Sequence, residues 1–201
     1  MTALMNTVDD STETTGRVRR VPGEPGLWIL LFGDMMVFLI LFGVYLHERG
    51  RQTQVFDHAQ ETLNRNLGAL NTLLLLASSL LVALAVRAVR GESRRLAPRL
   101  VIGGIACGLG FIVVKAFEYH AKLAAGLTPQ TNQFFMYYFV LTGLHLVHLI
   151  LGLAVLCALW VLARKPTLGK TQLAIFEGGA CFWHMVDLLW IVIFPLIFLV
   201  R

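Results

Sequence analysis

Five long apolar segments constrain this sequence more than any other feature. Each is about 20 residues long or longer, which is the length that an α-helix needs to cross the hydrocarbon core of a bilayer. We predict the spanning helices at residues 26–46, 67–89, 97–122, 133–163 and 172–200. A transmembrane β-barrel would show short segments of alternating polarity instead, and a soluble domain would be less apolar than the 57% found here. The predicted fold class is therefore all-α: a polytopic membrane protein with a bundle of five transmembrane helices.

The distribution of basic residues predicts the orientation of this bundle. Residues 1–24 are polar and lack the apolar core of a signal peptide, so we expect a disordered cytoplasmic tail ahead of a membrane domain at 25–201. Eleven Lys and Arg residues fall in this tail and in the second and fourth loops, against five on the other side. The positive-inside rule then places the N-terminus in the cytoplasm and the C-terminus outside. This bias explains the net charge of +5 without a nucleic-acid partner.

Ionisable residues interrupt the apolar segments, although each costs at least about 2.5–3.5 kcal/mol at the centre of a membrane helix. They are Asp34, Lys115, Glu118, His145, His148, Glu177, His184 and Asp187. Residues three or four apart share one face of a helix. We therefore expect Lys115 and Glu118 to form an ion pair. It would lie near the outer surface, where solvation would leave it worth about 0–1 kcal/mol.

The depth of the other residues predicts a buried polar network. At 1.5 Å per residue, His184 lies roughly 18 Å from the cytoplasmic end of its helix, and His148 and Asp187 lie roughly 22 Å from theirs. We predict that His184 and Asp187 form a hydrogen-bonded pair that His148 joins from the preceding helix. This contact would fix how the last two helices dock. Asp34, His145 and Glu177 complete the predicted network.

Three interpretations of this network are open. Imidazole is the commonest metal ligand, which would favour a metal or haem site. Di-iron bundles, however, use Glu-x-x-His pairs, and this chain has His184-x-x-Asp187 in the opposite order, so we assign no metal ligands. Chains of Asp, Glu and His also mark proton or ion paths. A fixed hydrogen-bond network that specifies helix packing is the interpretation that we favour, with the proton path next.

Four sequence blocks resemble those of subunit III of the haem–copper terminal oxidases, the cytochrome c oxidase family. FEGGACFWHMVDLLW at 176–190 is similar to the signature of the family's last helix, and TGLHLVHLILG at 142–152 to a block with two histidines. LNTLLLLASS at 70–79 is similar to the start of another helix, and KAFEY at 115–119 to a Gln-Ala-x-Glu-Tyr motif. The blocks come in the order of the family, and the resemblance covers nearly the whole chain.

The sequence departs from the family pattern in three respects. Gly33-Asp34 stands where the family usually has Ser-Glu, and Lys115 stands where it has Gln. The chain also lacks the two extra N-terminal helices of seven-helix members, so it resembles the five-helix bacterial form. The opening PGEPGLWILLFGDMMVF and the late Phe194-Pro195 look more like the E-type proteins found with nitric-oxide reductases.

The resemblance implies a non-catalytic subunit of an oxidoreductase complex in the bacterial plasma membrane. Such a subunit carries no cofactor of its own. It packs with the catalytic subunit I and subunit II, which hold the haem and copper, and it binds phospholipid. It supports aerobic electron transport, proton uptake and the integrity of the complex. The alternatives are an accessory subunit of a nitric-oxide reductase, a stand-alone haem or metal redox protein, and a small transporter.

Overall fold

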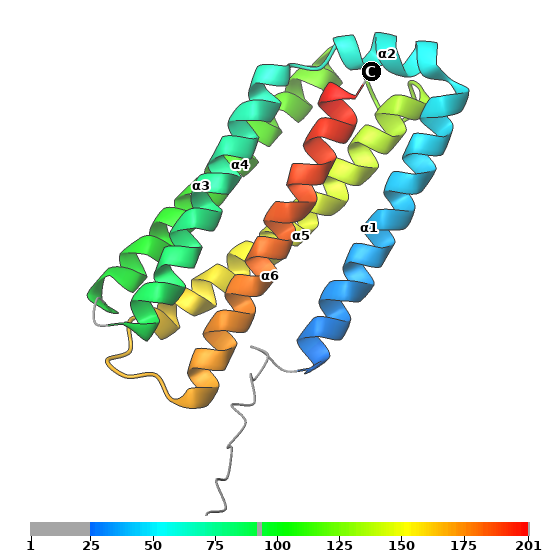
Figure 1. Cartoon of the computed structure of the whole chain (residues 1–201). Helices are drawn as coiled ribbons and strands as arrows, with labels where there is room; N and C mark the ends of the chain where they lie inside the picture. The colour runs from blue at the N-terminus through cyan, green and yellow to red at the C-terminus, as the bar shows by residue number, and fades with distance from the viewer. Residues whose placement is uncertain (1–24, 92–93, 201) are drawn as a thin grey trace, which may run out of the picture.

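The computed structural model describes residues 25–91 and 94–200, and Figure 1 shows a bundle of long helices. The helices are α1 (Pro25–Arg51), α2 (Thr53–Glu61), α3 (Arg65–Arg90), α4 (Ala97–Ala124), α5 (Gln133–Ala163) and α6 (Lys170–Phe194). A 3₁₀ turn, η1 (Arg94–Leu96), precedes α4, and a π-helical turn, η2 (Pro195–Leu199), follows α6. Five of the described helices are long and apolar enough to cross a membrane. This confirms the predicted fold class. The predicted tail at 1–24 lies outside the described residues.

Four of the long helices form a ring, and the fifth lies at its edge. Helix α3 packs against α4 and α6, and α5 packs against the same two helices. Helix α1 lies along the outside, where it contacts α5 and α6 (Figure 1). Much of α1 is apolar and exposed, including Ile29, Phe32 and Ile40. In a membrane protein, such a surface faces lipid or another subunit.

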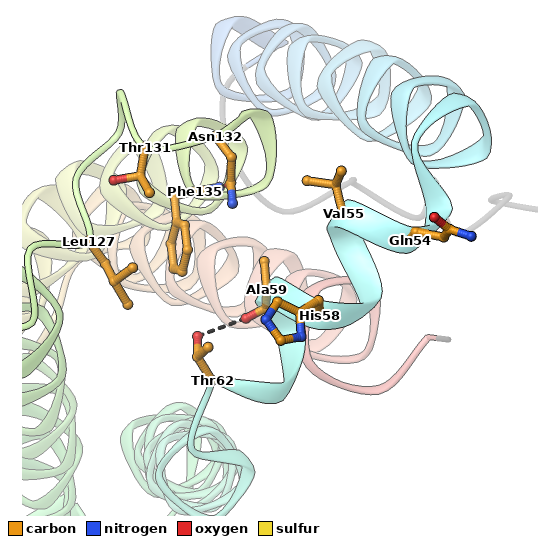
Figure 2. Close-up of a pocket in the computed structure, with 9 residues that line it drawn as sticks. All are labelled: Gln54, Val55, His58, Ala59, Thr62, Leu127, Thr131, Asn132 and Phe135. Atoms are coloured by element: carbon orange, nitrogen blue, oxygen red, sulfur yellow. Dashed lines mark hydrogen bonds between the residues drawn. The ribbon is translucent and has the colours of Figure 1, made fainter.

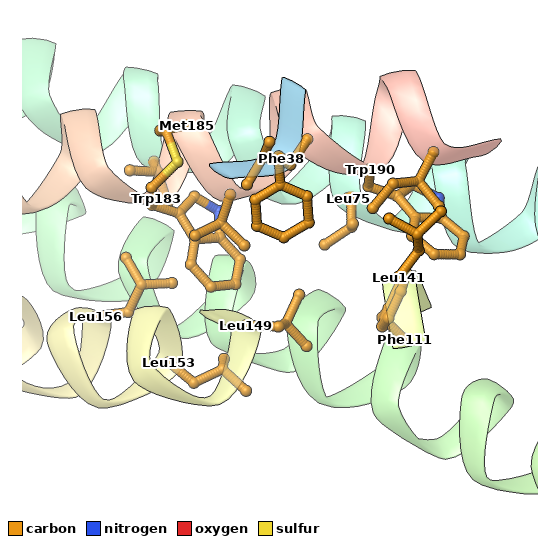
Figure 3. Close-up of a cluster of buried hydrophobic side chains, with 14 of the residues drawn as sticks. Phe38, Leu75, Phe111, Leu141, Leu149, Leu153, Leu156, Trp183, Met185 and Trp190 are labelled. Atoms are coloured by element: carbon orange, nitrogen blue, oxygen red, sulfur yellow. The ribbon is translucent and has the colours of Figure 1, made fainter. Parts of the chain in front are cut away.

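Two tryptophans of α6 fill the centre of the ring (Figure 3). Trp183 and Trp190 are both buried. Trp183 fits between α4 and α5 because both helices carry a glycine beside it. A Cβ atom at Gly152 would lie 2.8 Å from Trp183 Cε3, and one at Gly108 would lie 3.0 Å from Cη2. Small residues that let helices approach closely are typical of membrane interfaces, and here they position α6 in the bundle.

One end of the bundle is covered by α2, which the sequence analysis does not predict. This helix has nine residues and crosses the end of the bundle near the C-terminus (Figure 1). Its buried side is formed by Phe56, Ala59 and Gln60. Gln60 Nε2 donates a hydrogen bond to the carbonyl oxygen of Ile197 at 2.8 Å. A helix this short and polar leaves no long apolar segment in the sequence, which is why the prediction missed it.

The last spanning segment, Lys170–Leu199, agrees with the predicted 172–200, but its helix type changes near the end. Helix α6 ends at Phe194, and the backbone then changes from α-helical to the wider π-helical turn η2. The cause is Pro195, which has no backbone N–H and cannot continue regular helical hydrogen bonding. The N–H of Val200 bonds to the carbonyl of Pro195 at 2.9 Å, and Tyr45 of α1 donates to the carbonyl of Leu196 at 3.3 Å. The C-terminal turn is therefore fixed to α1 and α2.

Candidate functional site

A buried group of polar side chains joins α4 to α5, and we call it the Lys115 cluster: Lys115, Glu118 and Tyr138. Lys115 Nζ donates to Glu118 Oε2 at 2.9 Å and to the Tyr138 hydroxyl at 3.3 Å. The same hydroxyl donates to Glu118 Oε1 at 2.7 Å. Both carboxylate oxygens of Glu118 are thus bonded, and the cluster joins α4 to α5.

Aromatic rings surround the ammonium group of this cluster. The ring centroids of Tyr119, Tyr138, Trp190 and Phe198 lie 5.7, 5.0, 5.0 and 5.4 Å from Lys115 Nζ. A cation within about 6 Å of a ring face is attracted by the ring quadrupole. Three helices and the C-terminal turn contribute these rings, so the ammonium group is enclosed from several sides.

This enclosure corrects the expectation that Lys115 and Glu118 form a solvated pair near the outer surface. Their side chains are only 1% and 2% exposed. The predicted ion pair is present, but its depth along α4 did not reveal its burial, because that estimate counted residues along one helix axis. It did not include the C-terminal turn, whose Phe198 covers the pair. Breaking a buried ion pair costs much more than breaking an exposed one.

A second polar contact fixes α1 to α5. His148 Nε2 lies 2.9 Å from Asp34 Oδ1, with the two side chains 16% and 19% exposed. The other ring nitrogen, Nδ1, lies 2.8 Å from the carbonyl oxygen of Leu144. That oxygen can only accept, so Nδ1 donates to it and Nε2 faces the Asp34 carboxyl. His148 and Asp34 thus each have a polar partner, which lowers the cost of placing them among the helices.

His184 and Asp187 face α3, and among the described residues they bond neither to each other nor to His148, which corrects both predicted contacts. His184 Nδ1 lies 2.7 Å from Ser79 Oγ of α3, and Ser79 also interacts with the Asp187 carboxyl. Asp187 Oδ1 has no partner among the described residues. His148 instead contacts Asp34 of α1. The reason is the rotation of α6: its polar face turns toward α3 and away from α5.

The bond of Trp190 supports this account of the rotation of α6. Trp190 lies one turn beyond Asp187, and its Nε1 donates to Thr72 Oγ1 of α3 at 3.1 Å. Both polar contacts of this stretch of α6 therefore reach the same neighbouring helix.

His145 and Glu177 lie outside any shared network. His145 is fully buried, and neither ring nitrogen has a hydrogen-bond partner in the described part of the chain. Its ring packs against Phe111 and Trp190, with centroid separations of 5.6 and 5.2 Å. Glu177 pairs with Arg90, the last residue of α3, at 2.7 Å. The predicted residues are thus divided among separate helix contacts.

Sequence reasoning missed two of the partners in these contacts. Tyr138 lies seven residues before His145, two turns away on the same face of α5, and this spacing was a usable signal. Ser79 belongs to a quoted block, but serine is too common in membrane helices to single out. Within residues 25–91 and 94–200, no group of three or more His, Cys, Asp or Glu residues could hold a metal ion.

The hollow between α2 and the loop before α5 contains none of the predicted site residues. It has a volume of about 440 Å³, and its lining includes His58, Thr62 and Phe135 (Figure 2). Most of its surface is apolar. We therefore place the candidate site in the helix contacts of the interior.

Comparison with known proteins identifies the family. Residues 22–200 match the sequence profile of the family described as cytochrome c oxidase subunit III. Cytochrome c oxidase subunit 3 of Synechocystis is 30% identical over 98% of this chain and 86% of the relative. Cytochrome bo(3) ubiquinol oxidase subunit 3 of Buchnera aphidicola is 27% identical over 96% of this chain and 95% of the relative. The heme-copper oxidase subunit I+III of Aeropyrum pernix is 26% identical over 87% of this chain, which spans only 22% of that longer protein.

These matches cover almost the whole membrane domain, and they confirm the resemblance given by the four sequence blocks. The five helices able to span a membrane agree with a multi-pass protein of the bacterial membrane. The chain belongs to the cytochrome c oxidase subunit III family and is a subunit III of a haem–copper oxidase.

Proposed function

We propose that the chain is the non-catalytic subunit of its complex, packed against the catalytic subunit I and assembled with subunit II in the plasma membrane. There it supports aerobic electron transport, proton uptake and the integrity of the complex. The relative from Aeropyrum pernix supports the packing against subunit I, because its name, heme-copper oxidase subunit I+III, joins the two subunits in one protein. Two subunits that share one chain in a relative are expected to lie together when they are separate.

One observation carries the non-catalytic assignment: most of the ionisable residues within the helices connect one helix to another. The Asp34–His148 contact joins α1 to α5, and the Lys115 cluster joins α4 to α5. Two further contacts, His184 with Ser79 and Glu177 with Arg90, join α6 to α3. We infer that these groups fix helix positions, and that haem and copper lie in the partner subunits.

The electron donor of the parent complex is cytochrome c or a quinol, because the relatives include both a cytochrome c oxidase subunit and a ubiquinol oxidase subunit. We propose oxygen as the acceptor, since those relatives are oxidases. We further propose that the N-terminus is cytoplasmic. The basic residues at the ends of α3 and α5 and around η1 support this orientation.

Purification in mild detergent tests the proposal. An affinity-tagged chain should co-purify with a haem-bearing subunit, and the complex should show a reduced-minus-oxidised haem spectrum. The chain expressed alone should be colourless. A stoichiometric haem or iron signal in the isolated chain would identify a stand-alone redox protein instead. Oxygen and nitric-oxide consumption by the same preparation would distinguish an oxidase from a nitric-oxide reductase.

A further inference from the structure

A basic hollow lies at the end of the bundle opposite α2. Its volume is about 410 Å³, and it is enclosed by η1, the first turn of α4, the C-terminal end of α5 and the turn that follows. It is lined by Arg94, Arg95, Pro98, Ala163, Arg164, Lys165 and Pro166. Four of these seven lining residues are cations and none is an acid. We call this feature the basic hollow.

Arg94 of the basic hollow has unsatisfied hydrogen-bond donors. Its Nε and Nη2 are buried and have no hydrogen-bond partner among the described residues. Glu177 of α6 is already paired with Arg90 at 2.7 Å. An unpaired buried donor is costly, and like charges gathered in one hollow repel each other. Both costs fall when an oxyanion enters and Arg94 turns toward it.

The start of α4 adds positive potential to the same place. Helix α4 has 28 residues and begins at Ala97 beside the hollow, with no side-chain cap. The N-terminal end of a helix carries partial positive charge on its free N–H groups. An anion in the hollow would therefore meet the helix dipole as well as the four cations.

The flanks of the hollow identify the source of the anion. Arg164 lies over the ring of Trp160, 4.9 Å from its centroid, and tryptophan is typical of the level of lipid headgroups. Next to the hollow, Leu96 and Val161 are 49% and 56% exposed. A ligand with an anionic head and apolar tails fits this arrangement, with its tails on these two residues.

We propose that the basic hollow binds the phosphate of an anionic phospholipid. Basic pockets between helices on the cytoplasmic side of a membrane are suited to such headgroups. The inference gives a specific site to the phospholipid binding that the family resemblance implies. It rests on the proposed orientation, which places this end of the bundle on the cytoplasmic side, and not on which subunits accompany the chain.

Binding of phosphatidylglycerol to the purified complex and to the full chain alone tests this site, with native mass spectrometry in detergent as the readout. Phosphatidylcholine is the comparison lipid. Arg94→Gln and Arg164→Gln each remove one cation, and each should weaken phosphatidylglycerol binding about fivefold. This factor corresponds to the roughly 1 kcal/mol that one cation near a lipid surface contributes. Arg94→Lys should retain most of the binding. The matched control is Arg99→Gln, an exposed basic residue at the same end that does not line the hollow, and it should change binding less than twofold.

Several outcomes would overturn the proposal. Equal losses in the control and in Arg94→Gln would mean that net charge alone attracts lipid. Full displacement of phosphatidylglycerol by millimolar inorganic phosphate would make the hollow a site for free phosphate. Binding to the isolated chain but not to the complex would assign the hollow to a segment of a partner protein. Co-purification of the haem-bearing subunit with each variant tests the proposed function, independently of whether the variant binds phosphatidylglycerol.

Discussion

Replacement of Lys115 tests whether the buried cluster stabilises the bundle. Lys115→Met removes the ammonium group and leaves Glu118 with the Tyr138 hydroxyl as its remaining partner. Removing one partner of a buried ion pair costs about 3–5 kcal/mol, because the other charge stays buried without compensation. Loss of an exposed pair would cost only about 0–1 kcal/mol. Because the two side chains are only 1% and 2% exposed, we expect the larger loss of stability, that of a buried ion pair.

The measurement is the free energy of unfolding of the purified chain, from denaturant titration in mixed micelles. The double variant Lys115→Met/Glu118→Leu removes both charges and should recover more than half of the loss, so the two changes should couple strongly in a double-mutant cycle. Lys115→Gln keeps a donor for the carboxylate and should cost about 1–3 kcal/mol. Lys170→Met removes an exposed lysine at the start of α6 and should change stability by less than about 0.5 kcal/mol.

Two results would refute the reasoning on the Lys115 cluster. A loss below about 1 kcal/mol for Lys115→Met would mean that solvent or lipid headgroups reach the pair. Additive effects of the two single changes would mean that Lys115 and Glu118 do not interact in the folded protein, despite the 2.9 Å separation.

Three further predictions concern the remaining helix contacts. Asp34→Ala removes the partner of His148, so α1 should become more accessible to thiol labelling of introduced cysteines and stability should fall by about 1–3 kcal/mol. Unchanged labelling would contradict the role of this pair. Gly152→Ala places a Cβ 2.8 Å from a ring atom of Trp183, and this overpacking should cost about 1–3 kcal/mol of stability and lower the thermal midpoint. Gly43→Ala is the control, because no atom lies within 4 Å of its new Cβ, and it should not be destabilised. Asp187→Asn should assemble and turn over normally if the residue is structural, whereas normal assembly with slowed turnover would indicate a proton relay.

The helices were predictable because the physical requirement for crossing a bilayer is simple. A run of apolar residues specifies a spanning helix whatever its neighbours are. Pro195 was a visible signal for a change in the last span, and the structure places there the transition from α6 to the π-helical turn η2, since a proline is tolerated inside membrane helices. Helix α2 was missed because its nine residues are held by tertiary contacts such as the bond from Gln60 to Ile197.

The partners of the polar residues were less predictable than the residues themselves. Spacing along one helix determines which side chains share a face, as for His184 and Asp187. It does not determine which neighbouring helix that face meets. The neighbouring helix depends on how α6 is rotated about its axis. In the structure this rotation follows from the packing of Trp183 against Gly152 and from the hydrogen bond of Trp190 to Thr72 of α3.

The distribution of these contacts answers why the chain tolerates ionisable residues among its helices. Inside a bilayer, apolar surfaces gain little by meeting one another, because lipid tails are equally apolar. Packing of small residues and polar contacts therefore determine which helices associate. The polar contacts described here join α1 to α5, α4 to α5, and α6 to α3. Each contact would be left with an unpaired polar group if its helix rotated or slipped by one turn, so together they favour one arrangement of the bundle over its alternatives.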